Sequence, residues 1–65
     1  MTFKKGRFAN IICDESLKPL KMIVADNEYT TTIPIENSTL KTVKKAAMDV
    51  YQVAPKNILV TKVMD

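Results

Sequence analysis

Reactive side chains are few and widely spaced in this chain of 65 residues. The sequence contains no histidine, which removes the usual general base near neutral pH. Its single cysteine, Cys13, therefore has no imidazole to activate it as a nucleophile. We expect Cys13 to be a buried or half-buried strand residue, because free cysteine is among the most buried residue types. The sequence predicts no catalytic residue and no enzymatic activity.

Two acidic pairs are the next candidates for chemistry, Asp14 with Glu15 and Asp26 with Glu28. A calcium loop needs a longer series of oxygen ligands and a glycine hinge. A structural zinc site usually takes four cysteine or histidine ligands. The single glycine, Gly6, is too little to build a glycine-rich phosphate loop. We therefore predict solvated turn residues at both pairs, with no metal and no cofactor.

Basic residues form two groups in a chain with a net charge of +3. They are Lys4, Lys5 and Arg7 near the N-terminus, and Lys41, Lys44 and Lys45 on a predicted helix. These groups could bind nucleic acid, or they could be a solvated face that keeps a small domain soluble. Single-stranded nucleic acid is usually bound by aromatic rings among basic residues. Phe3 and Phe8 lie near the N-terminal group, so a small site on that arm stays open.

The composition is that of an ordinary globular domain, with 46% apolar and 26% charged residues. Residues 1–65 are expected to form one domain, and a chain this short buries only about 60% of its surface on folding. One cysteine excludes an intrachain disulfide, so an efficient core or self-association must supply stability. No apolar run approaches the roughly 20 residues of a membrane span. With an unpaired cysteine and no export signal, a cytoplasmic location is expected.

The strand pattern begins after a polar arm at residues 1–6. Residues 7–14 are rich in strand-forming side chains, and alternate positions carry apolar groups on both faces. Phe8 and Ile12 lie on one face, whereas Ala9, Ile11 and Cys13 lie on the other. Such a strand lies well inside a sheet or is covered on its second face by a partner.

A hairpin is predicted next, with strands at residues 20–25 and 29–35 around a turn at 26–28. Pro34 lacks an N–H for the ladder, so the second of these strands should lie at a sheet edge or carry a bulge. Alternation places Thr30 and Thr32 on one face with Pro34. The expected core face carries Tyr29, Thr31, Ile33 and Ile35.

A helix is predicted over residues 38–54, followed by a strand at 57–64. Asn37, Ser38 and Thr39 are all good N-cap residues, and Ser38 is favoured here. The helix should stop before Pro55, because proline disfavours helical geometry in the preceding residue. Its expected apolar stripe consists of Leu40, Val43, Ala47, Val50 and Ala54. The final strand is expected to place Ile58, Val60 and Met64 on one side, and Leu59 and Val63 on the other.

These elements predict a small α+β domain of two layers, with a mixed sheet of three or four strands covered by one helix in the order β-β-β-α-β. The first strand could join the sheet as a meander. The sheet order would then be third, second, first and fourth, with the last strand parallel to the first.

Residues 20–64 resemble a ubiquitin-like β-grasp domain. LKMIVADNEYTTTIPIE is similar to the opening hairpin of that family, and STLKTVKKAAMDVYQV followed by APKNILV resembles its helix, proline-containing turn and apolar strand. Modifiers and sulfur carriers of this fold end in Gly-Gly, whereas this sequence ends in Val63-Met64-Asp65. Ferredoxin-type members need several cysteines. The resemblance therefore implies the fold without conjugation, sulfur transfer or electron transfer.

The function expected from these features is that of a small protein–protein interaction module, which regulates or inhibits a larger protein and associates with itself. The edge-strand residues Tyr29, Thr30, Thr32 and Pro34 could pair with another chain by strand addition. Homodimerisation could use this edge or the first strand with its two apolar faces. The alternative is nucleic-acid binding through the two basic groups, which would weaken steeply with salt.

Overall fold

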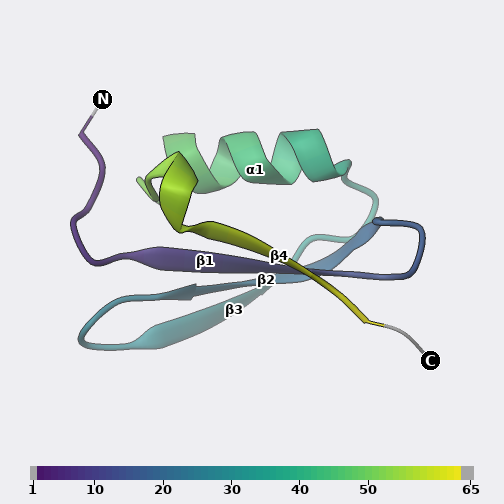
Figure 1. The fold of residues 1–65 in the computed structure, drawn as a ribbon, viewed down its shortest axis with the longest axis horizontal. Coiled ribbons are helices and arrows are strands. Elements are labelled where there is room, and N and C mark those ends of the chain that lie inside the picture. The colour runs from purple at the N-terminus through teal and green to yellow at the C-terminus, as the bar shows by residue number, and fades with distance from the viewer. Residues whose placement is uncertain (1, 64–65) are drawn as a thin grey trace.

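A computed structural model describes residues 2–63, which form an α+β domain of two layers (Figure 1). The elements follow in the order β1 (Phe8–Cys13), β2 (Pro19–Ala25), β3 (Thr30–Pro34), α1 (Leu40–Asp49), a short 3-10 helix (Pro55–Asn57) and β4 (Ile58–Lys62). This order confirms the predicted fold class. The predicted last strand also included Met64, which lies outside the described residues.

The four strands form one mixed sheet in the order β3-β2-β1-β4. β1 pairs with β2 antiparallel and with β4 parallel, and β2 pairs with β3 antiparallel. The meander arrangement of the first strand is therefore confirmed, and β1 lies in the interior of the sheet. β3 is an edge strand, as Pro34 predicted, and Pro34 pairs with Lys21 at the end of that strand.

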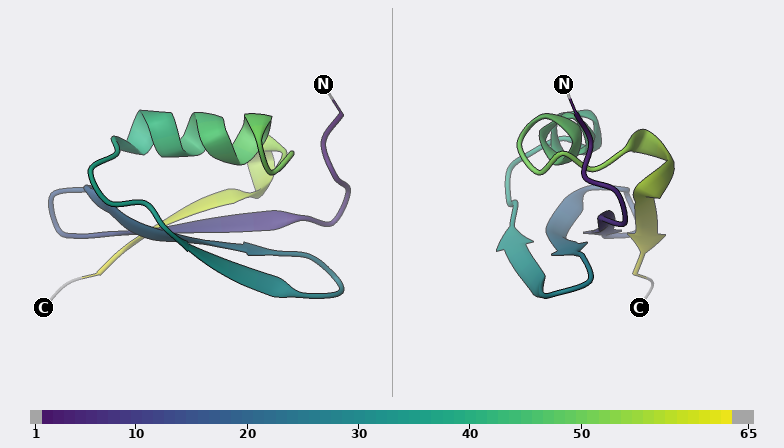
Figure 2. Two further views of the ribbon diagram at one scale, coloured as in Figure 1. Left: turned by 180° about the vertical axis from the view of Figure 1, so that it is seen from behind. Right: turned by 90° about the vertical axis from the view of Figure 1, so that its left-hand side faces the viewer.

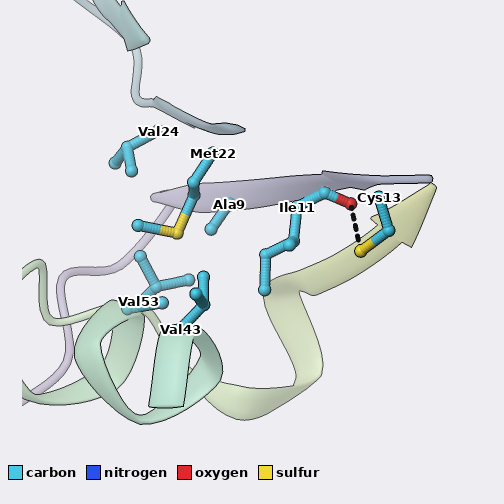
Figure 3. Packing of buried hydrophobic residues seen from close by; sticks show 8 residues of the cluster. Ala9, Ile11, Cys13, Met22, Val24, Val43 and Val53 are labelled. Atoms are coloured by element: carbon cyan, nitrogen blue, oxygen red, sulfur yellow. Dashed lines mark hydrogen bonds between the residues drawn. The ribbon is translucent and has the colours of Figure 1, made fainter. Parts of the chain in front are cut away.

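The hydrophobic core lies between the sheet and α1, which covers one face of the sheet in both views of Figure 2. Alternate residues of β1 and β2 point into it, and the helix and the segment after it close its opposite side (Figure 3). The buried apolar residues are Ala9, Ile11, Cys13, Met22, Val24, Val43, Ala47 and Val53. These side chains are expected to supply most of the stability, because burial of apolar area is the dominant favourable term in folding.

The helix begins one residue later than the favoured cap predicted. Thr39 is the N-cap, with an extended backbone at φ −88° and ψ 157°. Its Oγ1 accepts a hydrogen bond from the backbone N–H of Thr42 at 3.2 Å. This bond satisfies one of the amide groups that a helix leaves unpaired at its start. The choice of Ser38 was therefore wrong, although Thr39 was among the three candidates.

The helix ends at Asp49, which is earlier than the predicted residue 54. The chain turns sharply at Gln52, whose φ of 57° lies in the left-handed region, and the backbone N–H of Val53 donates to the carbonyl of Ala47 at 3.0 Å. The turn brings Val53 into the core, where it is 0% exposed, and leaves Val50 67% exposed. The prediction that Val50 belongs to the buried stripe was wrong, because Val50 lies at the C-cap, where the rest of residues 2–63 leaves its side chain exposed.

The predicted core face of the edge strand is only partly correct. Ile33 and Ile35 pack against the core, as expected. Thr31 is exposed, and Tyr29 precedes β3 and is 60% exposed. The reason is that α1 contacts β1, two strands away from this edge, so it does not cover the outer end of β3.

Candidate protein-binding surface

The sheet face turned away from α1, called the open face below, carries no other layer among residues 2–63 (Figure 2). Strand register assigns its members, because directly paired residues lie on the same face. They are Phe8, Asn10 and Ile12 of β1, Lys21, Ile23 and Ala25 of β2, Thr30, Thr32 and Pro34 of β3, and Leu59 and Thr61 of β4.

Large apolar side chains are exposed on this face. Phe8 is 54% exposed and Leu59 is 61% exposed, whereas Ile12 and Ile23 are half-buried by their neighbours. The register places Ile23 beside Asn10, and Asn10 beside Leu59, so these side chains cross the middle of the sheet in one row. Contiguous exposed apolar side chains of this kind make the open face a candidate site for contact with another macromolecule.

One polar pair lies within the open face. The Thr61 hydroxyl donates to Oδ1 of Asn10 at 2.7 Å, joining β4 to β1. Because this bond satisfies both oxygens within the chain, the pair can be covered by a partner at a lower desolvation cost than two unpaired polar groups.

The predicted edge-strand residues divide between two surfaces. Thr30, Thr32 and Pro34 all belong to the open face, where they continue it to the β3 edge. Tyr29 lies instead beside the N-terminal arm, in a hollow of about 310 Å³ that also involves Lys4, Lys5 and Arg7. The structure therefore brings Tyr29 together with the predicted basic arm and separates it from the rest of the edge strand.

The arm is attached to the domain by Arg7. Its guanidinium donates from Nη1 to the carbonyl of Tyr51 and from Nη2 to Oδ2 of Asp26, each at 3.0 Å. The backbone N–H of Lys4 also donates to the carbonyl of Gln52 at 2.7 Å. Arg7 thus links the arm to the β2–β3 turn and to the end of the helical segment. Two of the five guanidinium N–H donors are used in this way, which gives Arg7 a structural role in the domain.

The two basic groups do not form one surface. The arm lies beside the C-terminal end of α1 in Figure 1, as its bond to Gln52 requires. Lys41 is in the first turn of α1, about 12 Å along the helix axis from Asp49 at a rise of roughly 1.5 Å per residue. Lys44 and Lys45 are exposed in the middle of the helix. A nucleic-acid site would therefore use either the arm or the helix.

The candidates for chemistry have structural roles. Cys13 is fully buried, and its Sγ lies 3.9 Å from the carbonyl oxygen of Ile11 (Figure 3). Burial, with a smaller effect of Asp14, raises the pKa of the Cys13 thiol, which disfavours the reactive thiolate. Asp14 accepts bonds from the backbone N–H groups of Ser16 and Lys18, each at 2.9 Å, and so fixes the β1–β2 turn.

Asp26 plays the same part in the β2–β3 turn, and its contacts lead to a prediction on acid stability. Its Oδ1 accepts from the backbone N–H groups of Glu28 and Tyr29 at 2.9 and 3.1 Å. These bonds, with a smaller effect of Arg7, lower the pKa of Asp26 below its ordinary value of 3.8. Because the folded-state pKa is lower than the unfolded-state pKa, the full contribution to stability is present above the unfolded-state pKa. It is lost as the pH falls through the folded-state pKa.

We therefore expect Asp26→Asn to be less stable than wild type at pH 7, with a difference that shrinks as the pH falls below 3.8, the ordinary pKa of this carboxyl. Urea unfolding at a series of pH values measures this difference. Glu36→Gln, in an exposed loop, is the control for loss of a carboxylate elsewhere. An unchanged difference between wild type and Asp26→Asn across the series would contradict the role given to the ionised carboxylate.

The chain matches no protein-family model, and no curated protein or solved structure is significantly similar to it. The resemblance to ubiquitin-like β-grasp domains therefore stays a prediction.

The sequence indicated some members of the open face and not others. Apolar residues on both faces of β1 indicated a second covered surface, and Phe8 and Ile12 were assigned to it correctly. Leu59 was missed as a member, because its position depends on the pairing of β4 with β1 across more than 40 residues of sequence. Alternation within residues 57–64 does not reveal which neighbour β4 takes.

Proposed function

We propose that this protein is a small, non-enzymatic protein–protein interaction module that binds its partner through the open face. The observation that carries this proposal is the exposure of Phe8 and Leu59 on a sheet whose other face is already covered by α1. Aromatic residues are enriched in protein interfaces, and the fully buried centre of an interface is more apolar than the rest of the surface.

The β3 edge extends the same surface. Thr30 and Thr32 on the open face are exposed, and β3 has no neighbouring strand on its outer side within residues 2–63. A partner lying on the open face could add main-chain hydrogen bonds there. Pro34 limits such pairing at the end of the strand, because it has no N–H to donate. Contact through the face is therefore favoured over contact through the edge alone.

The test is capture of partners from a lysate of the source organism with wild type and two matched variants. Leu59→Glu places a charge on the open face, and Val50→Glu makes a similar change at an equally exposed position near the end of α1. We expect Leu59→Glu to reduce recovery of the wild-type partner by tenfold or more, and Val50→Glu to leave it unchanged. Equal recovery with both variants would overturn the proposal.

The same experiment with and without nuclease tests the alternative function. Material that is recovered only without nuclease would be bound through nucleic acid. If it were then lost from a variant with Lys4→Ala and Lys5→Ala, the arm hollow that contains Tyr29 would be the binding site. Loss from a variant with Lys41→Ala, Lys44→Ala and Lys45→Ala would identify the helix. Either result would replace the proposal by nucleic-acid binding.

A further inference from the structure

We propose that the partner of the open face is a second copy of this chain, and this inference rests on the proposed function. Two copies would pack sheet against sheet, so that the dimer has the layers α-β-β-α with the helices outermost. Sheets packed face to face in this way are a common arrangement, with strand directions within about 30° of each other. The open faces of the two copies would then form a second core between the sheets.

The exposed area of the chain supports this arrangement. Its accessible surface is 4697 Å² at a mass of 7.3 kDa. A monomeric globular protein of that mass is expected to expose only about 4,200 Å². One face of this sheet, with strands about 4.8 Å apart that rise about 3.3 Å per residue, spans roughly 350 Å² in projection. Burial of this face by each of two copies totals less than the roughly 1,200–2,000 Å² of a stable standard interface, which corresponds to a weak dimer.

The charge distribution also favours a second copy. Of the open-face residues, Lys21 alone is charged, and its pairing with Ile12 and Pro34 places it toward one end of the sheet. From there its apolar stem can lie along the interface while the ammonium group reaches water. The lysines of α1 lie on the opposite layer, so in the dimer they are far from the partner. Each copy carries a net charge of +3, and this geometry keeps most of that repulsion outside the contact.

The centre of the face suits a two-fold contact. Asn10 lies near the middle of β1 and pairs with Ile23 of β2, so a two-fold axis that runs between the two sheets, across the centre of the face, passes near both. Oδ1 of Asn10 is occupied by Thr61, which leaves its amide N–H groups as donors toward the partner. A buried asparagine fixes register in self-associating helices. Asn10 lies in the row between Ile23 and Leu59, so its N–H groups would fix the register of the two sheets in the same way.

The experiment is sedimentation equilibrium of the purified chain from about 1 µM to about 1 mM. We expect the mass to rise from 7.3 kDa toward twice that value as the concentration increases. Leu59→Glu and Phe8→Glu should shift the midpoint at least tenfold higher, whereas Val50→Glu should not shift it. Circular dichroism shows whether each variant keeps its fold. Phe8 and Leu59 are both more than half exposed, so we expect both open-face variants to fold.

Each other outcome has a defined meaning. A wild-type chain that stays at 7.3 kDa throughout would overturn the second copy as the partner. If the Leu59→Glu variant still lost a captured protein in that case, the proposed function would stand without this inference. A dimer that is insensitive to both Leu59→Glu and Phe8→Glu would also overturn the inference, and would move the contact to a sheet edge. A dimer sensitive to both variants confirms it.

Discussion

Ile11→Ala is expected to unfold a large fraction of the protein at 25 °C. Ile11 is 0% exposed and lies on the central strand, facing α1. Shortening a buried isoleucine to alanine removes apolar contacts and leaves a cavity, at a cost of about 2–5 kcal/mol. A domain of 65 residues has a total stability of roughly 3–10 kcal/mol, so this cost takes a large share of it.

The neighbouring residue supplies the matched control. Ile12→Ala makes the same chemical change one position along β1, on the open face, where the side chain is only half-buried. We expect it to cost about 1 kcal/mol or less in the monomer. Urea unfolding followed by circular dichroism, at a concentration low enough to avoid association, measures both variants. Equal losses would show that the two faces of β1 are equally covered, and would contradict the arrangement of one covered and one open face.

The order of the elements and the edge position of β3 followed from local features of the sequence. Pro34 excluded a central position for its strand, because the ladder needs an N–H that proline lacks. Alternation along β1 separated Ala9, Ile11 and Cys13 from Phe8 and Ile12, since successive side chains of a strand point to opposite faces, although it did not show which set faces the core. Both features act within a few residues, and they need no knowledge of what lies next to the strand.

The surfaces depend on contacts between distant residues, which local patterns do not encode. Arg7 meets Asp26 and the carbonyl of Tyr51, which are 19 and 44 residues away in sequence. The basic residues near the N-terminus suggested a phosphate-binding arm, but this pairing gives Arg7 a structural role. In the same way, the row from Ile23 to Leu59 on the open face exists only because β4 pairs with β1 at the edge of the sheet.

The end of α1 shows a different limit of sequence reasoning. The spacing of Val43, Ala47 and Val50 is that of a continuous helix, and Val53 appeared only to widen the stripe. Pro55 correctly indicated a break, but it did not indicate how many residues before it the helix would stop. The left-handed backbone of Gln52 decides where the helix stops. Glutamine rarely adopts this geometry, so the residue type at this position did not indicate the turn.

The early end of the helix leads to a second prediction with a large expected effect, which compares Val50 with Val53, three residues later. Val53→Ala is expected to lower the free energy of unfolding by about 2 kcal/mol, because it removes two methyl groups from a fully buried side chain. Figure 3 shows Val53 beside Val43, on the helix side of the core and facing the sheet. Val50→Ala removes the same atoms from a side chain that is 67% exposed, and should change stability by less than about 0.5 kcal/mol.

Urea unfolding of the two alanine variants tests the path of the chain after α1. If the helix continued to residue 54, Val53 would lie away from the stripe of Val43 and Ala47, and Val53→Ala would cost little. A loss of about 2 kcal/mol from Val53→Ala therefore supports the turn at Gln52, which brings Val53 into the core. The pair also matters for the binding experiments: Val50→Glu is a valid control there only if Val50 is outside the core, which the smaller effect of Val50→Ala would establish.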